Sequence, residues 1–284
     1  MQPRGTDTPA AGTGAPVVSV AAGRIADVTQ LPLHVHPFGP ADGRPVLAMH
    51  GVTGHGARYR VLAEALPGVR VHAVDLRGHG RSPWNPPWRI EQHVADVLGV
   101  LDGLGLDRAT VVGHSFGGAI AVHLARTAPE RVERLVLLDP ALGLDPERML
   151  EQAEAMRADE SFPDLDAARA DRAQRWAGLP ADRIEAELAE HLVADGDRLR
   201  YRYCQSAVVV AWSEMARPAI TPPAGTPTLL LPAAKADFVD PAWVEACRAE
   251  LGDALTVAEV DAGHMLFLER TEEVARLVGE FLAS

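Results

Sequence analysis

The chain has 284 residues, of which 47% are hydrophobic and 23% are charged, a composition that excludes disordered and collagen-like classes. Its formal net charge of −12 disfavours nucleic acids and anionic membrane surfaces as partners. No run of about 18 apolar residues occurs, so no membrane span is expected.

The first 22 residues are rich in Ala, Gly, Pro and Thr and lack the apolar run of a signal peptide. We expect a flexible tail there, and a cytoplasmic protein. From residue 31 onward, short apolar runs alternate with longer segments of helical period, which is typical of a largely parallel sheet flanked by helices. The expected strands are 31–36, 46–50, 69–76, 109–113, 132–139, 228–232 and 255–261. The expected helices are 57–66, 90–104, 116–127, 241–251 and 272–282, with Asp240 as N-cap of the fourth.

This alternation stops between residues 141 and 225, where Ala, Glu, Asp and Arg recur at helical spacing. We expect four helices there and no strand. Their expected bounds are 146–156, 165–176, 181–193 and 199–215. The sequence therefore predicts an α/β core, residues 23–140 and 221–284, with a helical cap inserted at 141–220.

The strongest local signal is GHSFG (113–117), a G-x-S-x-G that follows an apolar strand and precedes a helix. In this context Ser115 is a candidate nucleophile on a strained turn, and Gly113 and Gly117 leave room for that turn. A second signal, HGVTG (50–54), follows an earlier strand. We expect the backbone N–H groups of Val52 and Phe116 to form an oxyanion hole.

A general base must come from the 11 histidines, and His264 has the most suitable place, in the loop after the last strand. Two carboxylates could orient it, since Asp237 and Asp139 each follow a strand and each lie between Ser115 and His264 in the chain. Asp237 is our first choice because Asp240 already caps the next helix. Asp139 is the alternative.

These segments, together with DLRGHGRS (75–82) and AGHMLFLER (262–270), make the chain resemble the α/β-hydrolase superfamily from about residue 31 to 284. The resemblance implies an eight-stranded, mostly parallel sheet with a helical cap. It also implies that Ser115 is the nucleophile, His264 the base and Asp237 the acid, with Val52 and Phe116 as oxyanion donors. Haloalkane dehalogenases and typical epoxide hydrolases of this superfamily carry Asp as nucleophile, so Ser115 argues against both.

Five residues near these motifs or in the insert are candidate substrate contacts, although Trp212 could instead pack the insert onto the sheet and His114 could pack against the sheet. They are His50, His114, Trp84, Trp212 and Met265. The insert carries 10 arginines and 16 acidic residues, a net of −6, which favours a neutral substrate.

The predicted function is hydrolysis of a small to medium, apolar carboxylic ester through an acyl-enzyme, with no metal or other cofactor. The same triad could hydrolyse an amide, a lactone or a C–C bond, and a non-catalytic small-molecule receptor is the alternative from another class. A monomer and a homodimer are both compatible with the sequence. Cys204 and Cys247 form no metal or redox pattern.

Overall fold

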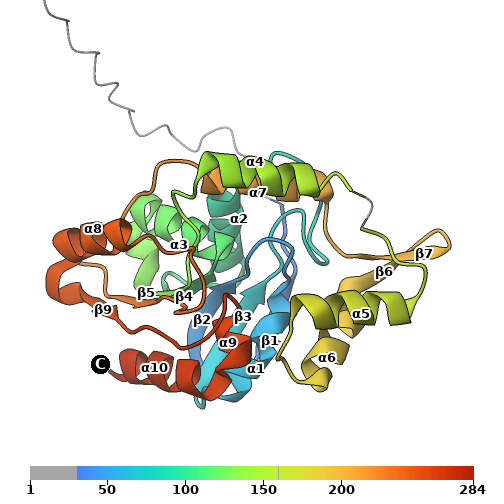
Figure 1. The fold of residues 1–284 in the computed structure, drawn as a ribbon. Helices are drawn as coiled ribbons and strands as arrows, with labels where there is room; N and C mark the ends of the chain where they lie inside the picture. The colour runs from blue at the N-terminus through green and yellow to red at the C-terminus, as the bar shows by residue number, and fades with distance from the viewer. Residues whose placement is uncertain (1–30, 159) are drawn as a thin grey trace, which may run out of the picture.

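The protein is described by a computed structural model that covers residues 31–158 and 160–284. The expected tail, residues 1–22, and residues 23–30 of the expected core lie outside the described residues. Seven strands form the main sheet in the order β1-β3-β2-β4-β5-β8-β9 (Figure 1). Strand β1 is antiparallel to β3, and every other neighbouring pair is parallel. The described part of the chain thus holds seven strands of this sheet where the resemblance implied eight.

Every strand and helix predicted for the core is present, with ends shifted by a few residues. The strands are β1 (Val35–Phe38), β2 (Arg44–Met49), β3 (Val69–Val74), β4 (Ala109–His114), β5 (Val132–Leu138), β8 (Thr228–Leu231) and β9 (Leu255–Val257). The helices are α1 (Arg60–Glu64), α2 (Ile90–Gly103), α3 (Phe116–Thr127), α8 (Pro241–Leu251), α9 (Leu266–Glu269) and α10 (Thr271–Ala283), with 3₁₀ turns at Gly56–Tyr59, Pro129–Arg131 and Gly252–Ala254. Asp240 caps α8 as predicted, because its side chain accepts a hydrogen bond from the N–H of Ala242.

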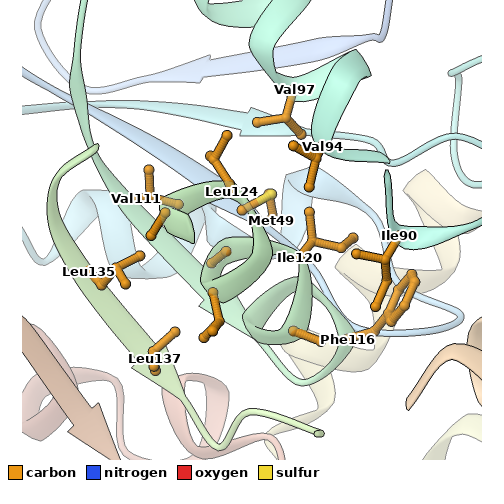
Figure 2. Packing of buried hydrophobic residues seen from close by; sticks show 14 of the residues in the cluster. Met49, Ile90, Val94, Val97, Val111, Phe116, Ile120, Leu124, Leu135 and Leu137 are labelled. Atoms are coloured by element: carbon orange, nitrogen blue, oxygen red, sulfur yellow. The ribbon is translucent and has the colours of Figure 1, made fainter. Parts of the chain in front are cut away.

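Both faces of the sheet are covered, which explains why its strands are continuous apolar runs. Successive side chains of a strand point to opposite faces. One face packs under α2, α3 and α8, and Figure 2 shows Met49, Val111 and Leu135 meeting Ile120 and Leu124 of α3 there. The opposite face packs against α1, α9 and α10. The loops that hold the candidate site leave from the ends of these doubly covered strands.

The insert between β5 and β8 contains four helices at the expected places and also a hairpin that was not expected, which takes up the end of the third expected helix and the start of the fourth. The helices are α4 (Pro146–Ala155), α5 (Leu165–Arg175), α6 (Ala181–His191) and α7 (Gln205–Met215), and the hairpin strands are β6 (Leu192–Asp195) and β7 (Arg198–Tyr201). The prediction of no strand was wrong because the two-residue turn Gly196-Asp197, with Gly196 at φ +63°, is a hairpin signal inside a helical pattern. Helices α4 and α7 lie along one another above the sheet, whereas α5, α6 and the hairpin lie to one side (Figure 1).

A buried ion pair ties the insert to the core. Glu187 of α6 accepts hydrogen bonds from Arg58, at 3.0 and 2.5 Å, and from Nε2 of His55, at 2.8 Å. Arg172 of α5 lies 3.9 Å from the same carboxylate, and all four side chains are buried. The carboxylate therefore holds groups from the core and from two insert helices at one point.

Among the described residues, no helix combines the length and apolarity that a bilayer crossing requires.

Candidate active site

Ser115 is the single residue between β4 and α3, and its backbone angles are those of neither a strand nor a helix. Its φ is +54° and its ψ is −121°, a left-handed region that L-residues rarely adopt. The backbone on both sides holds it there, because its N–H donates to the carbonyl of Leu138 and its own carbonyl accepts from the N–H groups of Gly118 and Ala141. The serine is only 5% exposed. Its predicted place on a strained turn is thus the observed one.

Two glycines around the serine leave no room for a side chain. A Cβ at Gly113 would overlap the carbonyl of Gly117, and a Cβ at Gly117 would overlap the carbonyl of Met49 in β2. The close approach of three backbone segments is what makes the turn sharp. It also places the N-terminus of α3 directly beside Ser115, where the first N–H groups of a helix have no intrahelical partner.

The carboxylate that meets His264 is Asp139. Nδ1 of His264 lies 2.6 Å from Oδ2 of Asp139, and Oδ1 of Asp139 accepts a hydrogen bond from the N–H of Ala233 at 3.0 Å. Asp139 follows β5 directly, has a φ of +42° and is buried, so both of its oxygens face partners within the fold. A carboxylate accepts only, so Nδ1 of His264 carries the proton and Nε2 is left as an acceptor.

The structure contradicts Asp237 as the partner of His264. Asp237 lies in the loop between β8 and α8, its side chain is 77% exposed, and its carboxylate pairs with Arg148 of α4 at 2.9 Å. The carboxyl end of the neighbouring strand β5 brings Asp139 to the histidine instead. Chain order could not separate these candidates, because both aspartates follow a strand and lie between Ser115 and His264 in the chain.

His114, which precedes the serine, supports the backbone of His264 rather than facing outward. Its Nε2 lies 2.8 Å from the carbonyl of His264 and therefore donates to it. Its ring is buried against Phe267. Burial, followed by the nearby His264, lowers the pKa of His114 well below its ordinary value, so the ring is neutral at pH 7. The structure thus places His114 against the backbone of His264, and its contact with substrate stays a prediction.

His50 fixes the loop that contains Val52. Its Nδ1 donates to the carbonyl of Gly51 at 2.7 Å, and its Nε2 accepts from the N–H of Leu76 at 3.0 Å. Both ring nitrogens are thereby used by backbone groups, so His50 has no nitrogen for a substrate. The loop closes with the N–H of Gly54 donating to the carbonyl of Gly51. A Cβ at Gly51 would lie 3.2 Å from Oγ of Ser115, so this loop runs directly past the serine.

The remaining predicted substrate contacts lie in three different places. Trp212 of α7 and Val52 both pack against buried apolar side chains of the insert and against those of the core. The buried indole N–H of Trp212 has no hydrogen-bond partner among the described residues. Met265 packs toward α1, α9 and α10. Trp84 lines a cavity of about 340 Å³ whose lining does not include Ser115. Of these three predicted residues, only Trp212 packs, like Val52, between the insert and the core.

Only one set of side chains in the described residues has the spacing of a metal site, and its carboxylate already accepts several hydrogen bonds. His34, His36 and Asp75 place one ligand atom each within 4.8 Å of one another. Asp75, however, accepts from His36 at 3.0 Å and from the N–H groups of Gly56 and Arg81. Asp75, the aspartate of DLRGHGRS, therefore connects the turn at Gly56 to the loop at Arg81.

Sequence reasoning missed Phe238, the residue after Asp237. Its ring stacks on the imidazole of His264, with ring centroids 3.9 Å apart and planes 23° apart. The only signal for Phe238 in the sequence is its place next to Asp237, in the loop after β8.

A strained serine at a strand–helix turn, followed in the chain by a carboxylate and a histidine at later strand ends of a mostly parallel sheet, is the arrangement that the resemblance implied. The family model for the alpha/beta hydrolase fold matches residues 44–271. The chain belongs to this family.

Relatives of known type agree with this assignment. The lipase LipV of Mycobacterium tuberculosis is 42% identical over 250 residues, which cover 87% of this chain and 96% of the relative. The sn-1-specific diacylglycerol lipase ABHD11 of Mus musculus is 30% identical over 91% of this chain and 87% of its own length. The solved structure of E-2-(acetamidomethylene)succinate hydrolase has a TM-score of 0.76 at 24% identity and covers 89% of this chain and 95% of its own, which supports the fold. The chain is an α/β-fold serine hydrolase of the carboxylic-ester type.

Proposed function

We propose that Ser115, His264 and Asp139 form the catalytic triad of an esterase that works through an acyl-enzyme. The observation that carries this proposal is the 2.6 Å bond between His264 and Asp139, which leaves Nε2 of the histidine as the free acceptor at the strand ends where Ser115 stands. Nε2 takes the proton of the serine hydroxyl, and the oxygen then attacks the ester carbonyl. The protonated His264 returns that proton to the leaving alcohol.

A second half-reaction releases the acid. Water attacks the acyl-enzyme, His264 accepts the water proton and passes it to Ser115, and the carboxylic acid departs. Asp139 stabilises the imidazolium in both halves, because its carboxylate is buried and already oriented by the N–H of Ala233.

The negative oxygen of each tetrahedral intermediate is proposed to bind the N–H groups of Val52 and Phe116. Phe116 is the first residue of α3, so its N–H lies at the positive end of the helix. Val52 lies in the loop that His50 anchors at both nitrogens. Donors that are already oriented need no rearrangement during the reaction, and each is typically worth about 10²- to 10³-fold in rate.

The proposed substrate is a neutral, fairly apolar ester of small to medium size. Residues 141–220 are proposed to act as a cap, with Trp212 at the junction where Val52 also packs. The net charge of −6 in this segment opposes anionic substrates. The relatives named as lipases support an ester as the bond that is cleaved.

A cytoplasmic location remains part of the proposal. Cys204 and Cys247 are both free thiols, which suits a reducing compartment. Fractionation of cells that produce the protein with its native N-terminus would test this, and recovery outside the cytoplasm would overturn it.

Turnover of p-nitrophenyl esters of increasing acyl length tests the function, with Ser115→Ala as control. We expect turnover by the wild type, its loss in Ser115→Ala, and a single phosphonate adduct on Ser115. Turnover of an amide, lactone or C–C substrate above that of every ester would reassign the bond. A protein that takes no label and turns over nothing would be a receptor on this fold.

A further inference from the structure

The imidazole of His264 has three ring or hydrogen-bond neighbours among the described residues, and one of them, the ring of His114, lies at a tilt of 41° with centroids 4.7 Å apart. Asp139 receives the Nδ1–H of His264, and the ring of Phe238 covers one face at a centroid distance of 3.9 Å. One hydrogen bond fixes a point on an imidazole but leaves the ring free to tilt about that bond. A stacked aromatic ring fixes the plane, and the plane decides where Nε2 points.

Phe238 is in turn contacted from the insert. The guanidinium of Arg148, on α4, lies 5.0 Å from the centroid of the Phe238 ring, and the same arginine pairs with Asp237 at 2.9 Å. Two neighbouring residues of the β8–α8 loop are therefore tied to one arginine of α4. The ion pair is largely exposed and contributes little by itself. The contact with the aromatic ring is the one that reaches His264.

The stack of Phe238 on His264 can also stabilise the charge that forms on the imidazole. The imidazole becomes a cation when it takes the serine proton, and a cation over an aromatic face is favoured. The side chain of His264 is 25% exposed, so a ring on one face also limits the water that reaches it. These contributions exist only when Phe238 lies parallel to the imidazole.

We propose that Phe238 is a positioning residue for His264 and that Arg148 holds Phe238 in place, so that helix α4 of the insert sets the geometry of the base. This inference rests on the proposed triad. It gives the insert a part in the chemistry, and it gives the loop at Asp237 a purpose that the aspartate itself does not have.

The first experiment replaces the ring. Phe238→Ala should lower kcat for a p-nitrophenyl ester about 10- to 100-fold with a much smaller change in KM, because the base is misplaced while the pocket remains. Phe238→Leu keeps most of the volume but not the flat face and should behave like Phe238→Ala. Phe238→Tyr keeps the ring and should retain most of the activity.

Phe38 provides a matched control elsewhere in the chain. Its ring lies parallel to that of His36, with centroids 6.2 Å apart, and the guanidinium of Arg60 lies 4.9 Å from its centroid. An arginine, a phenylalanine and a histidine thus lie in the same order here, with a wider separation between the two rings. Phe38→Ala should lower the denaturation midpoint and leave kcat near that of the wild type. A kcat for Phe238→Leu within twofold of wild type, or an equal loss of kcat in Phe38→Ala, would overturn the positioning role.

A double-mutant cycle tests the link to α4. Arg148→Ala should lower kcat in the wild type and have little further effect in Phe238→Ala, since it acts through that ring. Equal effects in the two backgrounds would overturn the role of Arg148. Asp237→Asn should leave kcat near the wild-type value.

A readout without turnover separates this inference from the proposed function. The Nδ1–H proton shared by His264 and Asp139 should give a downfield proton resonance in the wild type and in Phe238→Tyr, and it should broaden or disappear in Phe238→Leu. If no ester is turned over, the proposed function fails while this signal still tests the stacking. An identical resonance in wild type and Phe238→Leu would overturn the inference even in an active enzyme.

Discussion

Asp139 and His264 are separated by 125 positions in the chain, yet Oδ2 of the first lies 2.6 Å from Nδ1 of the second. Asp139 follows β5, His264 follows β9, and β8 lies between these strands in the sheet. The two loops converge because the extensions of β8 and β9 remain paired beyond the regular strands, with the N–H of Ala234 donating to the carbonyl of Val260 and that of Lys235 to Ala262.

Replacing each of the two candidate acids by asparagine should have very different effects on kcat. Asp139→Asn should lower kcat by about 10⁴, because an amide no longer holds the correct tautomer of His264 or stabilises its cation. Asp237→Asn removes only an exposed ion pair with Arg148, so kcat should change less than about threefold. Steady-state kinetics on one p-nitrophenyl ester are sufficient. The reverse ranking would restore Asp237 as the acid.

Gly51 should be essential to activity through its lack of a side chain. A Cβ there would lie 2.8 Å from Cβ of Ser115, so Gly51→Ala should displace the serine or the oxyanion loop and lower kcat at least about 100-fold. Gly103 is the control, since a Cβ at this end of α2 would meet nothing within 4 Å. Gly103→Ala should keep full activity, with a denaturation midpoint at or above wild type. Full activity in Gly51→Ala would refute the proposed packing of loop and serine.

The buried carboxylate of Glu187 should matter far more to stability than an exposed one on the same helix. Glu187→Ala leaves Arg58 and Arg172 buried without their shared carboxylate, and the free energy of unfolding should fall by about 3–5 kcal/mol. Glu185 pairs with Arg169 at 2.5 Å on the exposed side of α6. Urea denaturation should show little change for Glu185→Ala, and equal midpoints for the two variants would contradict this account.

Stability should fall as the pH decreases below about 6.5. Burial lowers the pKa of His93 to about 3 and that of His79 to about 4, whereas an unfolded histidine titrates near 6.5. Between these values the unfolded chain binds protons that the folded chain does not. Each such histidine therefore removes up to about 1.4 kcal/mol of stability per pH unit, and its contribution is fully present above pH 7.

Urea midpoints at pH 7.5 and 5.5 measure this loss. His93→Gln should reduce the difference between the two midpoints by the share of one histidine. His72→Gln should reduce it less, because His72 is half-buried and burial lowers its pKa less. A difference that stays unchanged in His93→Gln would show that His93 titrates in the folded protein much as it does in the unfolded one.

Local sequence patterns were sufficient to predict the core elements and the strained turn at Ser115. Strands buried on both faces are continuous apolar runs, and helices between them have their own period, so each element could be recognised alone. The turn at Ser115 depends on Gly113 and Gly117, which are sequence neighbours. The hairpin at 192–201 was missed because its turn signal, Gly196-Asp197, lies in a segment whose composition is helical.

The partner of His264 and the use of the Asp237 loop were decided only by the tertiary structure. Asp139 and Asp237 have the same local context, an aspartate after a buried strand, and their chain order relative to Ser115 and His264 is identical. Which carboxylate reaches the imidazole depends on how β5, β8 and β9 lie side by side, and on α4 bringing Arg148 to Asp237 and Phe238. The sequence by itself determined the fold and the candidates for nucleophile and base, because apolar periods and a short motif identify them. The carboxylate that meets His264 and the ring that stacks on it depend on contacts between distant segments, and these exist only once the sheet has assembled.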